Sequence, residues 1–168
     1  NTIGAVVDVQ PFGGRGLSGT GPKAGGPLIL RRLLAQAPAL PPLVRGRIPA
    51  TMARWTDWLR EQGEGKAAAT AAALTRQTLV GGQITLPGPV GESNLYSLTR
   101  RGNILCLAQT KAGLYDQISL ALSGDNAALV LADKSLTGWI AGLPDALQLV
   151  IRPVSTAKDE PCALVLGE

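Results

Sequence analysis

Hydrophobic and polar positions divide the chain into three zones, of which the last has the clearest pattern. Over residues 93–168, short apolar runs alternate with helical patterns. The pattern predicts strands at 104–108, 127–131, 147–151 and 163–166, and helices at 113–122 and 135–141. Because a chain returns to a parallel strand through a crossover that covers the sheet, this order predicts a parallel sheet. We therefore expect an α/β fold with a Rossmann-like βαβαβ half-domain.

The middle zone, residues 36–92, is predicted to be a Pro-rich and helical connector. Four prolines fall between residues 37 and 49, which favours an extended segment there. Beyond them the pattern predicts helices at 51–62 and 66–80, a strand at 83–86 and a Gly-Pro turn at 87–91. Thr51 is the expected N-cap of the first helix, and Gly63 is its expected stop.

One face of the first predicted helix carries Trp55, Trp58 and Leu59 at helical spacing. Two interpretations are open for this face. It packs in the core of the protein, or it forms a surface that binds a partner. The spacing alone favours the core.

Glycine dominates the first zone, residues 1–35. Residues 2–27 contain eight of the chain's 21 glycines, between a predicted strand at 3–9 and a predicted helix at 28–35. Glycines at this density serve positions that need positive φ or close backbone approach. Three interpretations compete: a flexible linker, a phosphate-binding loop, and a rigid loop in the wall of a binding site. The preceding strand argues against a linker, and the motif G-x-x-x-x-G-K-[ST] of phosphate-binding loops is absent.

Charge and cysteine content exclude several classes of function. The net charge of +4 comes from 16 basic and 12 acidic residues that are scattered along the chain, so we expect no nucleic-acid binding. The chain has no histidine, and Cys106 and Cys162 lie in apolar runs without metal-ligand spacing. We therefore expect no metal site and two buried, reduced thiols, as in a cytoplasmic protein. No apolar run is long enough to predict a membrane span.

A long motif in the first zone resembles a known family. The string PFGGRGLSGTGPKAGGP, which begins at Pro11, is similar to the loop PFGGxxxSGxGxKxGG near the C-terminal end of aldehyde dehydrogenases. With the preceding GAVVDVQ it resembles the pyrroline-5-carboxylate dehydrogenase branch, and within that branch the C-terminal part of the bifunctional proline utilization A family. The string LPGPVGESNLY of the middle zone also resembles that family. Asp8 and Arg15 depart from the pattern, where Gly and Glu are expected.

The last zone resembles the nucleotide domain of aldehyde dehydrogenases, but its chemistry is changed. The string RGNILCLAQTKAGLYDQISLALSGDNAALVLADKS is similar to the first βαβ unit of that family. Gln109, Thr110 and Lys111 stand where the family has Pro-Trp-Asn, and residues 132–135 replace its ribose-contacting Lys-Pro-Ser/Ala-Glu. The resemblance thus implies a degenerate Rossmann domain over residues 93–168 that binds no cofactor. Neither cysteine has the family's Gly-Gln-Arg-Cys surroundings, so we expect both to be structural and no catalytic residue in this chain.

The resemblance also implies a parent enzyme that extends beyond this chain. Its dehydrogenase module oxidises L-glutamate γ-semialdehyde to glutamate with NAD, and a proline dehydrogenase module carries FAD. The chain begins at Asn1 without Met, and we expect it to be a C-terminal fragment. Its expected partners are the rest of the parent enzyme and the semialdehyde. The parent is expected in the cytoplasm, with attachment to the inner membrane face as an option.

By this resemblance, residues 1–35 end the catalytic domain and hold the substrate. Gly4 and Ala5 are expected to donate backbone N–H groups to the substrate carboxylate, and Phe12 to pack on its methylenes. The alternative is a purely structural or interaction module, which closes a substrate-channelling tunnel or supports homo-oligomerisation. In both cases the isolated chain is expected to be inactive.

Overall fold

The computed structural model describes residues 12–13, 15–20, 34–36, 47–86, 90–156, 158 and 160–167. The chain divides into two compact units. One comprises Asn1–Val44 with Gln83–Ser97, and the other comprises Arg45–Gly82 with Leu98–Glu168. The predicted domain limits of 1–35, 36–92 and 93–168 stay a prediction.

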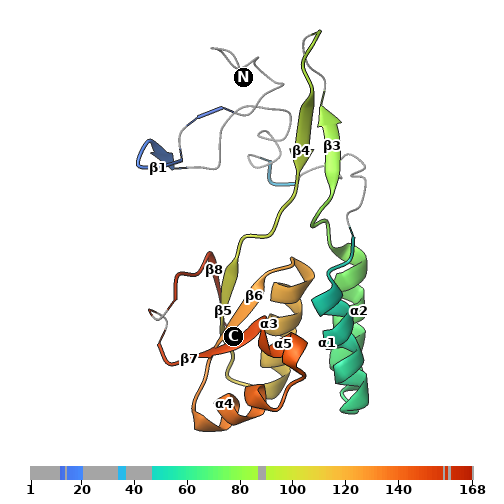
Figure 1. Ribbon diagram of the computed structural model, residues 1–168, viewed down its shortest axis with the longest axis vertical. Helices are drawn as coiled ribbons and strands as arrows, with labels where there is room; N and C mark the ends of the chain where they lie inside the picture. The colour runs from blue at the N-terminus through green and yellow to red at the C-terminus, as the bar shows by residue number, and fades with distance from the viewer. Residues whose placement is uncertain are drawn as a thin grey trace. The chain divides into compact units, whose positions relative to one another are not determined.

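The described residues of the first unit form two small antiparallel pairs (Figure 1). Strands β1 (Arg15–Gly16) and β2 (Gly19–Thr20) make a short hairpin, and β3 (Gln83–Leu86) pairs with β4 (Asn94–Ser97). The prediction of β3 is confirmed, whereas β4 was not predicted.

Two predicted elements of the first zone fall largely beyond these residues. The predicted strand at 3–9 lies outside the described residues, as does most of the predicted helix at 28–35. Its described end, Leu34 and Ala35, is not helical.

A four-stranded parallel sheet forms the centre of the second unit. Its strands are β5 (Asn103–Leu107), β6 (Ala127–Leu131), β7 (Ile151–Val154) and β8 (Leu164–Gly167). They lie in the order β7-β6-β5-β8, and every neighbouring pair is parallel. This confirms the predicted α/β fold with a parallel sheet. The order also matches the strand order 3-2-1-4 of doubly wound folds, so the sheet is compatible with a Rossmann-like domain.

Five helices accompany this sheet among the described residues: α1 (Ala50–Glu61), α2 (Gly65–Gln77), α3 (Lys111–Ser123), α4 (Lys134–Ala141) and α5 (Asp145–Gln148). The predicted N-cap at Thr51 is wrong, because α1 begins one residue earlier and Pro49 occupies the N-cap position. Gly63 follows the end of α1 with φ of +74°, as a helix stop requires. The strand predicted at 147–151 is wrong over most of its length, because Leu147 belongs to α5 and β7 begins only at Ile151.

Helices cover one face of the sheet. Ile104, Cys106 and Val130 point to this face and share one buried cluster with residues of all five helices. Helix α3 lies directly against β5 and β6, and the pair α1–α2 packs on its outer side (Figure 1). Right-handed crossovers explain the arrangement, since β5, β6 and β7 follow one another in a single direction across the sheet.

The chain crosses back from β7 to β8 over the opposite face. Leu105 and Leu129 are buried on this face, and Arg152 shares it because its register partner is Leu129. The Arg152 guanidinium binds both carboxylate oxygens of Glu160, at 3.0 and 2.7 Å, and the Asn103 side chain at 3.2 Å. This bidentate pair ties the return connection to the sheet.

The apolar face of α1 lies in the core of the second unit. Trp55 and Leu59 are fully buried, and Trp58 packs against the same cluster. Of the two open interpretations, the core is confirmed. The predicted connector therefore supplies part of the core beside the parallel sheet.

Candidate functional site

The predicted substrate loop lies mostly outside the described residues. Gly4 and Ala5 are not among them, so their expected role stays a prediction. Phe12 is described, and its side chain is 63% exposed. Gly13, beside it, has φ of +126°, a backbone conformation that only glycine adopts readily. An exposed ring beside a glycine that fixes the turn is compatible with a surface that receives a ligand.

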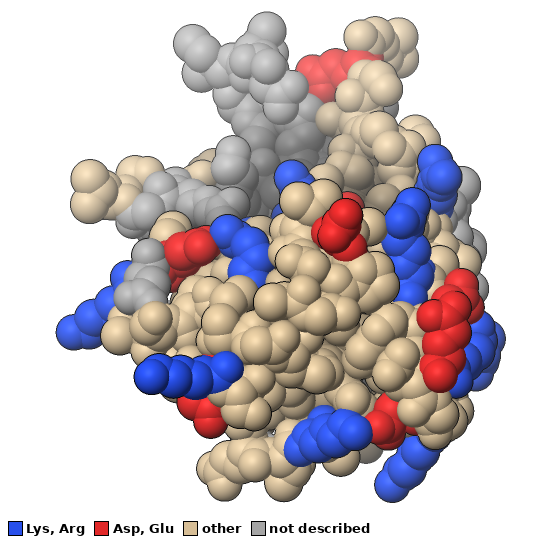
Figure 2. Space-filling model, turned by 60° about the horizontal axis from the view of Figure 1, so that its bottom comes forward, with Lys and Arg blue, Asp and Glu red and all other residues tan. Residues whose placement is uncertain are grey.

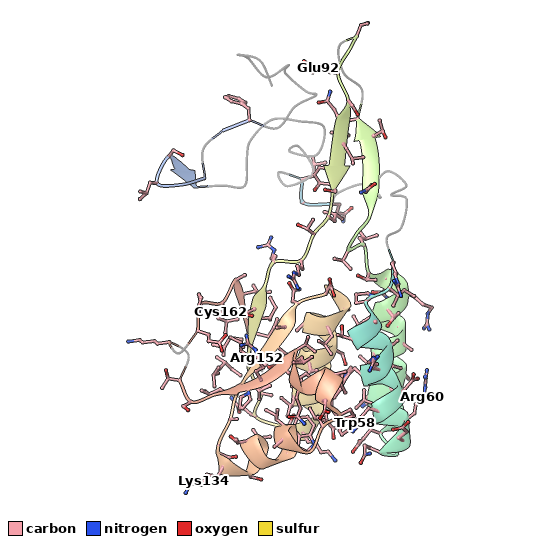
Figure 3. The ribbon with its side chains drawn as sticks, viewed as in Figure 1. Trp58, Arg60, Glu92, Lys134, Arg152 and Cys162 are labelled. Atoms are coloured by element: carbon pink, nitrogen blue, oxygen red, sulfur yellow. The ribbon has the colours of Figure 1, made fainter. Side chains whose placement is uncertain are left out.

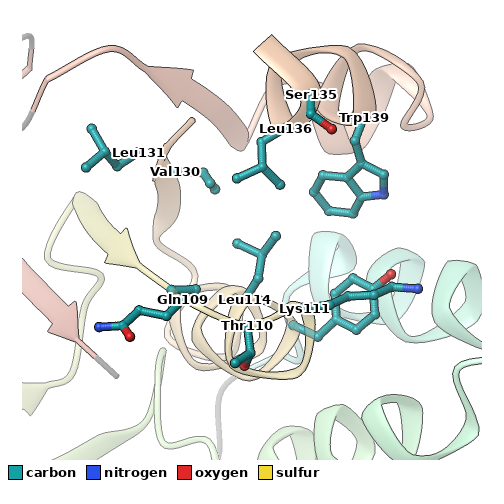
Figure 4. A pocket seen from close by; sticks show the side chains of 11 residues that line it. Gln109, Thr110, Lys111, Leu114, Val130, Leu131, Ser135, Leu136 and Trp139 are labelled. Atoms are coloured by element: carbon teal, nitrogen blue, oxygen red, sulfur yellow. The ribbon is translucent and has the colours of Figure 1, made fainter. Parts of the chain in front are cut away.

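A second candidate site is a hollow of ≈ 300 Å³ at the carboxyl ends of β5 and β6, which we call the edge slot (Figure 4). Parallel sheets bind ligands at this edge, because their strands end there and the following helices begin. One wall comes from the start of α3, the other from α4, and the floor from the end of β6. The main lining residues are Thr110, Lys111, Leu114, Tyr115, Val130, Ser135, Leu136 and Trp139.

Both helices that begin at the edge slot are capped by the chain's own side chains. Thr110 Oγ1 accepts a hydrogen bond from the Gly113 N–H of α3 at 3.0 Å. Asp133 Oδ1 accepts one from the Leu136 N–H of α4 at 2.9 Å. A dinucleotide site instead leaves these N–H groups open, with glycines that let the pyrophosphate approach. The caps fill the positions that a phosphate would use.

The cation at the slot is already paired. Lys111 Nζ lies 2.6 Å from Glu64 Oε1 and 5.5 Å from the centre of the Tyr115 ring. The hydrogen bond to Glu64 raises the pKa of Lys111, and the neighbouring charges add to it. Burial raises the pKa of Tyr115. Both groups therefore keep their protons at neutral pH, which makes neither of them a base or a nucleophile.

Aromatic rings connect the edge slot to the core. The Trp55 and Trp58 rings stack at 5.2 Å, and Trp139 meets Trp58 edge to face at 5.8 Å. Tyr115 contacts all three, its ring centre lying 6.1 Å from that of Trp139. The sequence prediction did not single out Tyr115 or Trp139. The signal was present, because an aromatic residue stood near the start of each predicted helix that follows a strand.

The two cysteines have different surroundings. Cys106 is fully buried in β5, and burial raises the pKa of its thiol to about 12, so its predicted structural role is confirmed. Cys162 is exposed, which makes the prediction of two buried thiols wrong (Figure 3). It precedes β8, an edge strand that pairs only with β5, and most of whose side chains face solvent.

The described residues contain no group of three or more His, Cys, Asp or Glu side chains that could hold a metal ion. In the part of the chain that the structure describes, no helix has the length and apolar character needed to cross a lipid bilayer. On the face shown in Figure 2, basic and acidic side chains are interspersed. A nucleic-acid interface would gather basic side chains on one surface.

Comparisons with known proteins give one consistent result. The chain is 43% identical to the bifunctional protein PutA of Rhizobium meliloti, over 95% of this chain and 13% of the relative. The chain is related to PutA. It is also 41% identical to the PutA of Salmonella typhimurium and 36% identical to that of Escherichia coli, each over 88% of this chain and 12% of the relative. No family model matches the chain.

These alignments to PutA cover most of the chain, so they bear on both compact units. The chain spans only 12–13% of the length of these PutA proteins. What a whole PutA does is therefore carried by much more sequence than this chain contains.

Proposed function

We propose that this chain is part of a bifunctional enzyme of proline catabolism. In this enzyme a FAD-dependent module oxidises proline, and a NAD-dependent module oxidises L-glutamate γ-semialdehyde to glutamate. The observation that carries the proposal is the identity of 36–43% to three PutA proteins over 88–95% of the chain. The PFGG loop motif supports the dehydrogenase assignment. The buried Cys106 thiol, with its high pKa, supports a catalytic cysteine that lies outside this chain.

The first contribution of the chain is to anchor the substrate. Gly4 and Ala5 donate two adjacent backbone N–H groups to the semialdehyde carboxylate, and Phe12 packs on its methylenes. Two N–H donors hold an anion without placing a second charge in the site. Each such charge-assisted hydrogen bond contributes about 1.5–3 kcal/mol.

The second contribution is a cover without chemistry. The parallel-sheet unit binds neither NAD nor NADP, and it closes the path between the two active sites of the parent. The capped helix N-termini at the edge slot support this role, because they leave no open N–H pair for a pyrophosphate.

A purely structural or interaction module is the second candidate function. It is favoured by the β8 edge, where Leu164 and Val165 are each about half exposed beside an open strand edge. Open strand edges with apolar side chains pair readily with other chains. In this case the chain supports homo-oligomerisation or closes the tunnel, and it touches no substrate.

The anchor is tested by Gly4→Val in the full-length enzyme. A branched side chain at this position displaces the carboxylate, so KM for the semialdehyde should rise at least about tenfold, equal to about 1.4 kcal/mol. Activity on propanal, which has no carboxylate, should change much less. Gly65→Val is the matched control, because a Cβ at Gly65 meets no atom within 4 Å. Equal losses on both aldehydes would show that the loop is structural and would remove the anchor assignment.

The cover is tested by ending the parent enzyme before Arg45. This cut removes α1 and α2 together with the parallel sheet, so the apolar face of α1 is not left open to solvent. Oxidation of added semialdehyde should persist, while conversion of proline to glutamate should gain a lag as the intermediate escapes. Loss of both activities would contradict a pure cover. Calorimetric titration of the full chain with NAD and NADP completes the test, and micromolar binding of either would refute the assignment.

A further inference from the structure

The edge slot is open to a ligand of a different kind from a nucleotide. Leu114 and Leu136 point toward each other across it, and the Trp139 ring forms part of its α4 wall (Figure 4). Val130 closes the floor. Its volume of ≈ 300 Å³ is that of about ten water molecules, at about 30 Å³ each. The size lies at the lower limit of small-molecule pockets, which are mostly apolar with a few polar groups.

The electrostatics of the slot select against anions. Lys111 is its only charged lining side chain, and Glu64 already holds the ammonium group at 2.6 Å. A ligand carboxylate would have to displace Glu64 or share its partner. The caps on α3 and α4 have used the N–H groups that would otherwise attract an anion. An uncharged ligand meets none of these penalties.

Polar side chains remain at the slot for a neutral head group. Thr110 and Ser135 carry hydroxyl groups on its two walls, and Gln109 adds an amide. A hydroxyl or amide on the ligand can exchange hydrogen bonds with such groups at little cost, because neither partner carries a charge.

We propose that the edge slot binds a small, uncharged, ring-containing molecule that carries one hydroxyl or amide group, and that it is a ligand site distinct from any dehydrogenase active site. The apolar walls hold the ring beside Trp139. The polar group of the ligand faces the hydroxyls at the slot opening. This inference does not depend on the proposed enzyme, because it uses only residues of the parallel-sheet unit.

The test uses benzyl alcohol and benzoate, which share a ring and differ in charge. The full 168-residue chain is labelled with ¹⁵N, and the indole N–H signals of its three tryptophans are followed during titration. Benzyl alcohol should move the Trp139 signal in a saturable way, with a dissociation constant on the order of 1 mM. The Trp55 signal should stay in place, because its ring is fully buried outside the slot. Benzoate should bind at least about fivefold more weakly, because Lys111 is already paired.

Two variants reduce the slot from different positions. Leu136→Phe adds a ring inside it, and Ser135→Gln lengthens an exposed side chain at its wall without entering the core. Each should weaken benzyl alcohol binding at least about fivefold. Leu149→Phe is the matched control, because Leu149 is 77% exposed and does not line the slot.

Several results would overturn the proposal. The first is a Trp139 signal that does not respond to benzyl alcohol at concentrations well above its expected dissociation constant. The second is wild-type binding by both blocking variants, which would place the ligand elsewhere. Equal or tighter binding of benzoate would show that the slot prefers anions. Displacement of benzyl alcohol by NAD would make the slot a nucleotide site, a result that also contradicts the proposed cover.

Discussion

A buried hydrogen bond between α1 and α3 gives a sharp test of how the helical layer is held together. Trp55 Nε1 donates to Ser119 Oγ at 2.9 Å, and Ser119 Oγ donates to the Tyr115 carbonyl at 2.7 Å. Trp55 and Ser119 are both fully buried. Ser119→Ala removes the acceptor and leaves the indole N–H of Trp55 in the core without one.

The expected cost follows from these contacts. A buried donor without an acceptor costs about 1–3 kcal/mol. Alanine has a higher helix propensity than serine, which returns up to about 0.5 kcal/mol. Ser119→Ala should therefore lower the free energy of unfolding by about 1–2 kcal/mol. In a chain of this size, this corresponds to a fall of about 2–8 °C in the melting temperature.

A double-mutant cycle isolates the hydrogen bond from other effects of the substitution. In a Trp55→Phe background there is no indole N–H to leave unpaired, so Ser119→Ala should change stability by less than about 0.5 kcal/mol. Urea unfolding followed by far-ultraviolet circular dichroism measures all four variants, because tryptophan fluorescence changes with the substitution itself. Ser123→Ala on the same helix is the control, since its hydroxyl bonds only to the Leu120 carbonyl at an exposed position. An equal cost of Ser119→Ala in both backgrounds would refute this explanation.

Three further outcomes follow from other described contacts. The folded pKa of Cys106 is raised from 9.0 to about 12, so stability should be complete below pH 9 and fall between pH 9 and 12, by up to about 1.4 kcal/mol per pH unit, with the Cys106-dependent fall absent in Cys106→Ala. A thiol reagent at pH 8 should label Cys162 in the native chain and leave Cys106 unlabelled, and rapid labelling of both would contradict the burial of Cys106. Asp133→Ala removes the cap of α4 and should lower the free energy of unfolding by about 0.5–2 kcal/mol, whereas Asp133→Asn should retain most of it.

Much of the parallel-sheet unit could be predicted from local pattern, and the errors have physical causes. Strand β6 was predicted to the residue, because its apolar run is short, fully bounded and buried on both faces. The strand expected at 147–151 failed because a short apolar run does not by itself distinguish strand from helix. Pro144 and Asp145 start a helical turn there, and the strand begins only with Ile151.

Tertiary context explains what the pattern could not give. Strand β4 has a polar sequence, and it becomes a strand by pairing with β3 across the turn at Gly91. Cys162 precedes an apolar run that looks buried, yet β8 is an edge strand with one neighbour. The edge slot also escaped prediction, because it depends on where α3 and α4 begin relative to each other. Neither distance nor volume is written in the local spacing of residues.

The caps at Thr110 and Asp133 affect how this edge of the sheet can change under mutation. Each cap stabilises its helix by about 0.5–2 kcal/mol, at a position where a phosphate-binding turn needs a bare N–H. A single substitution that frees one of these N–H groups weakens the fold, and it restores only part of the turn because the required glycines are also missing. Intermediate sequences are thus less stable and gain no new ligand. Selection for stability alone is enough to keep this edge closed to phosphates, generation after generation.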